Sequence, residues 1–270
     1  MCFYNSMSKR ALDLAKRYGR KTDIVEIYKE IMEEKRRNGE LVEDATENTY
    51  RITAFPQKNN LGNHIYKNCS IITADVQLQV MQWGMIPSWV VVKTETQAGI
   101  NKALIDADIW RQRTFNARCE DIFEKRTFAE PIIQRRCIIP STGYFEFHHN
   151  QDGTTTPFFL SYEDRDIISM GGIWNVWIHP ISGERISTYS IITTPANTLA
   201  SEIHNSGSNP GRMPLIIYDS DVKGWLNPNL SKPDIFRLMK PAKDEGMKVI
   251  QVSKDFRDLN PKDETILISA

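Results

Sequence analysis

Short segments with alternating apolar and polar residues dominate the chain from about residue 50 onward. Eight of them are rich in β-branched and aromatic residues and bounded by Gly, Pro, Asn or Asp, which is typical of strands. They are 51–55, 70–80, 135–140, 143–149, 157–162, 167–178, 185–193 and 247–253. Helical patterns interrupt them at 119–131, 195–204, 219–226 and 232–239. Many strands with few regular strand–helix–strand units predict an α+β fold with a curved, barrel-like, mostly antiparallel core flanked by helices.

Residues 8–40 follow a different pattern, because they are highly charged and their apolar residues recur at helical spacing. Thr22 or Asp23 can cap a helix start, and Gly39 follows its end. We predict a short helix ending near Gly19 and then a longer amphipathic helix. Its interleaved acids and bases favour a solvated face over a nucleic-acid contact. With no repeat or linker to divide the chain, we expect a single domain over 1–270 with a helical elaboration at about 8–40.

The composition excludes several classes of function. The 270 residues carry a formal net charge of zero, so no strong, indiscriminate attraction to nucleic acid or membrane is expected. No apolar run is long enough to span a bilayer, and the amino terminus lacks a signal-peptide pattern. The four cysteines are scattered and form no CxxC pair, which fits a reducing compartment and argues against structural zinc. We therefore expect a cytoplasmic protein, a monomer, with no membrane contact, metal or cofactor.

The segment GYFEFH provides the first candidate for chemistry. On a strand, Tyr144 and Glu146 share one face, while Phe145 and Phe147 share the other and are typical of core. Glu146 is then either an exposed surface carboxylate or a general acid/base on a rigid strand. The pattern alone favours the surface carboxylate.

The segment TFNARCED places Asn116 and Arg118 two residues apart in an extended stretch, hence on one face. An amide beside a guanidinium suits a planar or phosphate-bearing anion. The alternative is the start of a helix with a surface arginine.

Further along, His204 ends a predicted helix and is followed by a polar loop and by Arg212. A histidine there is either a favourable partner of the helix dipole or a proton shuttle. In WGMIPSW, Trp83 and Trp89 are either core residues or an exposed platform for unpaired bases.

The sequence begins with Cys2 directly after Met1. Removal of Met1 would give Cys2 a free α-amine next to its thiol, so that one residue would carry two nucleophiles.

Taken together, these motifs resemble the SOS response-associated peptidase (SRAP) family, the abasic-site processing proteins. The resemblance rests on Cys2 after Met1, WGMIPSW, FNAR, RRCIIPSTGYFEF, ITTPAN and EIH…RMPLII, in the order of the family. The chain departs from the family pattern in Phe3-Tyr4-Asn5, where a small residue and an arginine are usual, and in a longer loop after His204.

The resemblance implies a β-rich core and a groove for single-stranded DNA in which Cys2 crosslinks to an abasic site as a thiazolidine. By motif, Asn116, Glu146 and His204 would complete the catalytic site, and Arg118 and Arg212 would contact phosphates. Crosslinking or lyase activity, with possible self-processing at Met1, would make the protein an enzyme. Two other classes stay open: an amino-terminal-nucleophile hydrolase or peptidase, and a non-catalytic single-stranded DNA-binding module.

Overall fold

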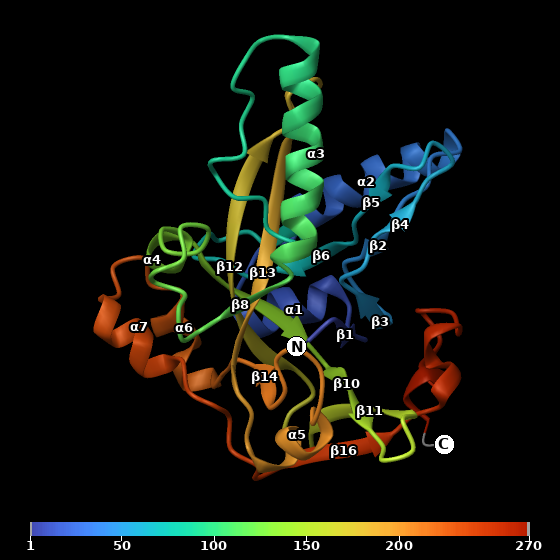
Figure 1. Cartoon of the computed structure of the whole chain (residues 1–270), viewed down its shortest axis with the longest axis vertical. Helices are drawn as coiled ribbons and strands as arrows, with labels where there is room; N and C mark the ends of the chain where they lie inside the picture. The colour runs from blue at the N-terminus through green and yellow to red at the C-terminus, as the bar shows by residue number, and fades with distance from the viewer. Residues whose placement is uncertain (1, 269–270) are drawn as a thin grey trace.

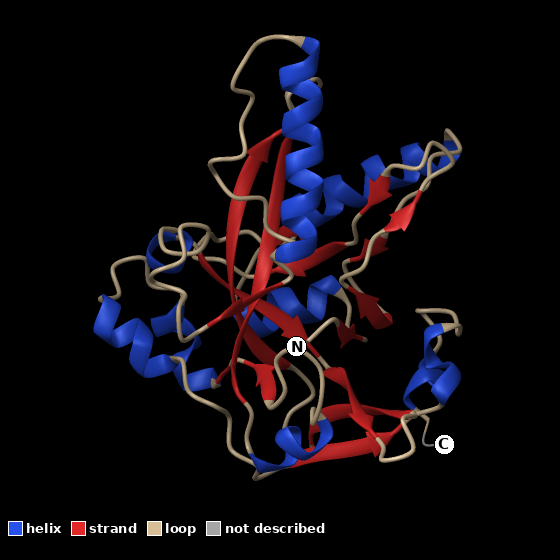
Figure 2. Ribbon diagram, viewed as in Figure 1, coloured by secondary structure: helices blue, strands red, loops and turns tan. Residues whose placement is uncertain are grey.

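The computed structural model describes residues 2–268 and forms a curled, half-barrel β structure flanked by helices (Figures 1 and 2). The strands are β1 Tyr4–Met7, β2 Asp44–Ala45, β3 Thr49–Thr53, β4 Gln57–Lys58, β5 His64–Ile65, β6 Asn68–Ile71, β7 Gln79–Trp83, β8 Asn116–Arg118, β9 Arg136–Ser141, β10 Gly143–His149, β11 Thr155–Tyr162, β12 Ile168–Ile178, β13 Arg185–Pro195, β14 Arg212–Pro214, β15 Ile216–Ile217 and β16 Met247–Gln251. The α-helices are α1 Ala11–Tyr18, α2 Asp23–Arg37, α3 Gln97–Arg113, α4 Pro131–Gln134, α5 Thr198–Ile203, α6 Asp219–Trp225 and α7 Lys232–Leu238, with 3₁₀ turns η1 Lys254–Arg257 and η2 Glu264–Leu267. The α+β class predicted from the sequence is confirmed.

Two sheets build the core. The smaller has the strand order β16-β11-β10-β1-β3, so the amino-terminal strand lies inside the sheet with partners on both sides. The larger follows β15-β12-β13-β7-β6-β2, with β9 added on β12 and β8 and β14 added on β13. The long strands β12 and β13 form its spine, and β8 joins β13 in parallel. The β1–β10 pairing brings residue 2 near the segment around residue 146, and a hydrogen bond from Asn116 to Cys2 brings β8 to the same region.

Close backbone packing at the centre of the larger sheet requires a residue without a side chain. A Cβ atom at Gly172 would lie 2.3 Å from Ile139 Cδ1 and 2.7 Å from the Ser190 carbonyl oxygen. The backbone of β13 at Ser190 could therefore not keep its present position beside β12 if Gly172 were replaced, and the Ile139 side chain would have to move as well.

Seven of the eight predicted strands correspond to strands of the structure, and the two predicted amino-terminal helices are α1, which ends at Gly19 in a left-handed conformation, and α2. The predicted strand over 70–80 is wrong, because this segment contains the end of β6, a turn and the start of β7, which pair with each other antiparallel. Two further elements differ. Residues 119–130 form turns rather than a helix, and only Pro131–Gln134 is helical. The 17-residue helix α3 was not predicted, because it buries small residues and an arginine (Ala103, Ala107 and Arg111) while exposing Ile105 and Ile109. Within the described residues, no helix is both long and apolar enough to cross a membrane.

Candidate active site around Cys2

Cys2 lies two residues before β1, the first strand of the chain. The pairing of β1 with its neighbours in the sheet limits where Cys2 can lie. Strand β1 pairs with β10 in a register that sets Tyr4 opposite Phe145 and Asn5 opposite Tyr144. Cys2 is fully buried, and its Sγ lies 3.5 Å from the Tyr4 carbonyl oxygen, to which it donates. Burial raises the pKa of the Cys2 thiol well above its usual value, and the nearby Glu146 carboxylate raises it further. The thiol is therefore neutral at physiological pH.

Glu146 shares this buried environment. The alternation predicted for β10 is confirmed, since Phe145 and Phe147 pack with Phe256 in a separate apolar cluster. Glu146 projects to the opposite face and is only 3% exposed, so the expected surface carboxylate is wrong. Burial raises the pKa of Glu146 to about 7. A carboxyl group with this pKa changes readily between its acidic and basic forms near neutral pH.

Asn116 connects Cys2 to the larger sheet. Its side-chain Nδ2 donates to the Cys2 carbonyl oxygen at 2.9 Å, and β8 holds it through parallel pairing with β13. The Oδ1 atom of the same amide is buried and has no hydrogen-bond partner within residues 2–268. The amide thus fixes the Cys2 backbone and presents an acceptor beside it.

His204 caps the end of helix α5. Two hydrogen bonds hold the next residue, Asn205, against β10. Asn205 accepts from the His149 backbone N–H at 2.9 Å and donates to the His149 carbonyl at 3.0 Å. His204 Nδ1 accepts from the Arg212 backbone N–H at 3.1 Å. Burial lowers the pKa of His204 to about 4, so the ring is neutral at pH 7. With Nδ1 accepting, the proton of the neutral ring is on Nε2, which makes that nitrogen a donor.

A cavity of about 200 Å³ lies between Glu146 and His204. It is lined by Phe3, Tyr4, Phe145, Glu146, Phe147, His149, His204, Ser206, Gly207, Ser208 and Asn209. Cys2 and Asn116 do not line it; Cys2 lies just before β1, which pairs with the strand of Glu146, and Asn116 is hydrogen-bonded to Cys2.

The two arginines expected at phosphates differ in their surroundings. Arg118 is exposed, and it donates to Asn209 Oδ1, on the rim of the cavity, at 3.2 Å. Arg212 is buried, its guanidinium pairs with Glu120 through both oxygens, and it donates to the Thr193 carbonyl at 2.7 Å. Arg212 thus supports His204 through its backbone N–H and has little freedom to reach a phosphate.

The two tryptophans do not form a shared platform. Trp83 is a core residue that stacks on Tyr189 and donates to the Phe115 carbonyl at 2.9 Å. Trp89 belongs to a different cluster, where it packs edge-on against Trp110 at 4.7 Å between ring centroids. The expectation of a paired stacking surface is corrected, because the Trp83 ring has no face open to a base.

Three residues near the site were given no functional role from the sequence. Tyr144 and Asn5 are buried on the face of Glu146, and the Tyr144 hydroxyl and Asn5 Oδ1 have no hydrogen-bond partner among the described residues. Phe55 lies 47% exposed with its ring 5.3 Å from that of Phe3. The only signal in the sequence was their position next to Cys2, Glu146 and a strand end, which does not distinguish them from core residues.

No group of three or more His, Cys, Asp or Glu side chains within residues 2–268 is arranged to hold a metal ion. The site is instead built from one thiol, one carboxyl, one amide and one neutral imidazole.

Comparisons with known proteins agree with this architecture. The SOS response associated peptidase (SRAP) family model matches residues 1–259. The abasic site processing protein YoqW of Bacillus subtilis is 30% identical over 178 residues, covering 66% of this chain and 70% of that protein. HMCES of Gallus gallus, also named an abasic site processing protein, is 27% identical over 186 residues, 61% of this chain and 50% of its own length. A crystal structure of a protein from Bacteroides thetaiotaomicron superposes with a TM-score of 0.81 at 38% identity over the whole of both chains.

The fold and the site thus define an SRAP-type protein in which Cys2 is buried beside Asn116, just before β1. The chain belongs to the SOS response associated peptidase family.

The raised pKa of Glu146 predicts a pH-dependent stability. A folded-state pKa of about 7, above the usual 4.5, means that the folded protein binds more protons than the unfolded chain between these values. Stability therefore falls as pH rises through this window. Glu146→Gln should be more stable than the wild type by up to about 3 kcal/mol at pH 8, and the difference should shrink toward pH 4. Urea unfolding of both proteins across this range measures it.

The exposed Glu163 offers a matched control, since Glu163→Gln removes a charge outside the pocket. His204 contributes the opposite trend, because its lowered pKa removes stability as pH falls from 6.5 toward 4. Comparing variant with wild type at each pH cancels that contribution. A Glu146→Gln difference that is the same at pH 5 and pH 8 would contradict the buried, titrating carboxyl.

Proposed function

We propose that this protein processes abasic sites in single-stranded DNA by forming a covalent link through Cys2. The observation that carries the proposal is the position of Cys2 just before β1, which pairs with the strand of Glu146, with Asn116 donating to the Cys2 carbonyl and His204 sharing a cavity with Glu146. Membership of the SRAP family and the printed names of the relatives support it.

The chemistry begins with removal of Met1, which lies outside the described residues. The backbone nitrogen of Cys2 then becomes a primary amine with an ordinary pKa of about 7.7–8.0. A ring-opened abasic sugar carries an aldehyde. The amine adds to its carbon, and loss of one water gives an imine. The Cys2 thiol then adds across the C=N bond, the thiol proton moves to nitrogen, and a five-membered thiazolidine results.

The raised pKa of the thiol sets the order of these steps. Because the buried thiol remains protonated, little thiolate is present to attack the aldehyde first. The amine therefore forms the first bond, and the thiol closes the ring on the more electrophilic imine. A serine at this position would lack the soft sulfur, and an internal cysteine would lack the amine.

Glu146 carries the proton transfers, and His204 supplies a hydrogen bond. Glu146, with its pKa of about 7, takes a proton from the attacking amine and returns it when water leaves. His204 is neutral and keeps its proton on Nε2, so it donates a hydrogen bond to the sugar ring oxygen and stabilises the charge that develops there as the aldehyde opens. Asn116 orients the amine through its hydrogen bond to the Cys2 carbonyl.

The strand of DNA would follow the rim of the cavity. Arg118 supplies a cation there, and the half-exposed Phe55, packed on Phe3, offers an aromatic face to an unpaired base. Arg212 and Trp83 are left out of this surface because both are buried. Trp89, the monomeric state, the cytoplasmic location and the single-domain organisation over 1–270 remain predictions.

The two nucleophiles of Cys2 can be separated by mutation. Cys2→Ala keeps the amine and loses the thiol, so we expect an imine that borohydride traps but no heat-stable adduct with abasic single-stranded DNA. Cys2→Ser should behave in the same way, because its hydroxyl closes the ring poorly. Gel analysis of adducts with and without borohydride measures both species.

An extra residue placed before Cys2 is the complementary variant, since it blocks the amine and leaves the thiol intact. It should abolish both kinds of adduct. If this protein crosslinks at the wild-type rate, a simple thiol adduct replaces the proposed mechanism. Turnover of small amides by the wild type without any DNA adduct would favour an amino-terminal-nucleophile hydrolase instead.

The two arginines predict contrasting variants. Arg118→Ala should weaken binding to single-stranded DNA about three- to tenfold and reduce the slope of log affinity against log salt by about 1, with unchanged stability. Arg212→Ala should instead lower the free energy of unfolding by about 1–3 kcal/mol, because Glu120 and the Thr193 carbonyl lose a charged donor. Fluorescence anisotropy across salt concentrations and urea unfolding test the pair. An unchanged salt slope for Arg118→Ala would remove this residue from the DNA surface.

A further inference from the structure

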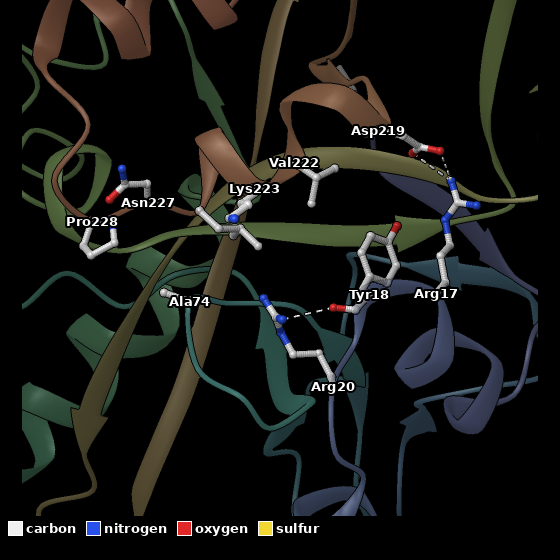
Figure 3. Close-up of a pocket in the computed structure, with 10 residues that line it drawn as sticks. Arg17, Tyr18, Arg20, Ala74, Asp219, Val222, Lys223, Asn227 and Pro228 are labelled. Atoms are coloured by element: carbon white, nitrogen blue, oxygen red, sulfur yellow. Dashed lines mark hydrogen bonds and ion pairs between the residues drawn. The ribbon is translucent and has the colours of Figure 1, made fainter.

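A larger cavity of about 690 Å³ lies between helix α1, the loop before β7 and helix α6 (Figure 3). Its lining residues are Arg17, Tyr18, Arg20, Ala74, Asp219, Val222, Lys223, Leu226, Asn227 and Pro228. None of them lines the cavity beside Glu146 and His204. The volume is in the range of small-molecule sites and far larger than an inorganic ion needs.

The charges at this cavity are unevenly paired. Arg17 is held by both oxygens of Asp219 at 2.9 and 3.0 Å and by the Ile167 carbonyl at 3.2 Å, so its charge is largely compensated. Arg20 donates to backbone carbonyls, those of Tyr18 at 3.0 Å, Gly19 at 3.4 Å and Thr73 at 2.8 Å. Asp75, the acid that acts electrostatically on Arg20, does not line the cavity. The lining therefore carries an excess of positive charge.

Two basic side chains line this cavity. The Nε atom of Arg20 is buried and has no hydrogen-bond partner within residues 2–268, although a buried donor of this kind is costly to leave unpaired. Lys223, on α6, is exposed, and it lines the same cavity (Figure 3). A guanidinium from the loop after α1 and an ammonium from α6 are groups suited to one phosphate.

The remaining walls suit an organic body attached to that phosphate. Tyr18, Val222 and Leu226 provide apolar surface, and the side-chain amide of Asn227 provides a polar group at the far end (Figure 3). The walls are held in place from behind. The Tyr18 hydroxyl is 2.8 Å from Ser169 Oγ on β12, and the buried Arg136 donates to the Trp225 carbonyl at 2.7 Å at the end of α6.

We propose that this cavity is a second ligand site that binds a nucleoside phosphate, with the phosphate between Arg20 and Lys223 and the base against Tyr18, Val222 and Leu226. The ligand is either a free nucleotide or a nucleotide within a DNA strand, and the two share this chemistry. The inference does not rest on the chemistry of Cys2, because the residues that carry it belong to different elements.

Calorimetric titration of the full chain with deoxyadenosine monophosphate, deoxyadenosine and inorganic phosphate tests the site. The monophosphate should bind, and the nucleoside and the phosphate ion should each bind at least about tenfold more weakly. Lys223→Ala should weaken monophosphate binding about tenfold, because a charge-assisted contact is lost. Arg20→Ala should weaken it at least as much, but Lys223 is the cleaner probe because its side chain is exposed.

Lys240→Ala is the matched control, since it removes an exposed lysine just after α7 that does not line the cavity.

A short single-stranded oligonucleotide without abasic sites identifies the source of the ligand. If Lys223→Ala weakens oligonucleotide binding as well, the site holds part of a strand; if only the monophosphate is affected, the site holds a free nucleotide. The proposal is overturned if millimolar monophosphate does not bind, or if the Lys223 and Lys240 variants bind it equally. At a saturating concentration of abasic DNA, the rate of crosslinking through Cys2 should be unchanged in Lys223→Ala whether or not the site holds part of the strand, so that failure at one site is distinguishable from failure at the other.

Discussion

The site depends on one constraint, which is the insertion of the amino-terminal strand β1 between β10 and β3. Main-chain hydrogen bonds on both edges of β1 leave the residues just before it little freedom, so Cys2 is fixed against Glu146. Asn116 adds a third attachment from the larger sheet through the Cys2 carbonyl. An amino-terminal residue is ordinarily mobile. Here the pairing of β1 and the hydrogen bond from Asn116 hold Cys2 in one position.

Burial in this same region produces the acid–base properties of the site. It raises the pKa of Glu146 to about 7, lowers that of His204 to about 4 and raises that of the Cys2 thiol. All three shifts favour neutral groups, as expected where water is excluded. A neutral imidazole that donates and a carboxyl that titrates near pH 7 are the forms needed for carbonyl–amine condensation. Placing an ionisable carboxyl there reduces stability at high pH, a common cost of function.

The sequence alone predicted the regular part of this fold because its strands alternate clearly and its turns carry glycine, proline and asparagine. It failed for α3, whose buried face consists of alanines and an arginine, and for residues 119–130, where apolar residues occur at helical spacing without forming a helix. Glu146, Asn116 and His204 were identified as candidate site residues through their motifs. The burial of Glu146 could not be predicted, since it depends on strands distant in sequence. The same limit applies to Arg212 and Trp83, whose partners Glu120 and Tyr189 are brought to them only by folding.

The central claim is that both nucleophiles of Cys2 bond to a single aldehyde carbon. Tandem mass spectrometry of the proteolysed adduct with abasic single-stranded DNA tests it most directly. The account predicts a modified peptide that begins at Cys2, with Met1 absent and a mass equal to the peptide plus the sugar fragment minus one water. It also predicts that neither the thiol nor the amine of this peptide reacts with alkylating reagents. A modified peptide that retains Met1, or one in which the thiol of Cys2 is still alkylated, would contradict the account.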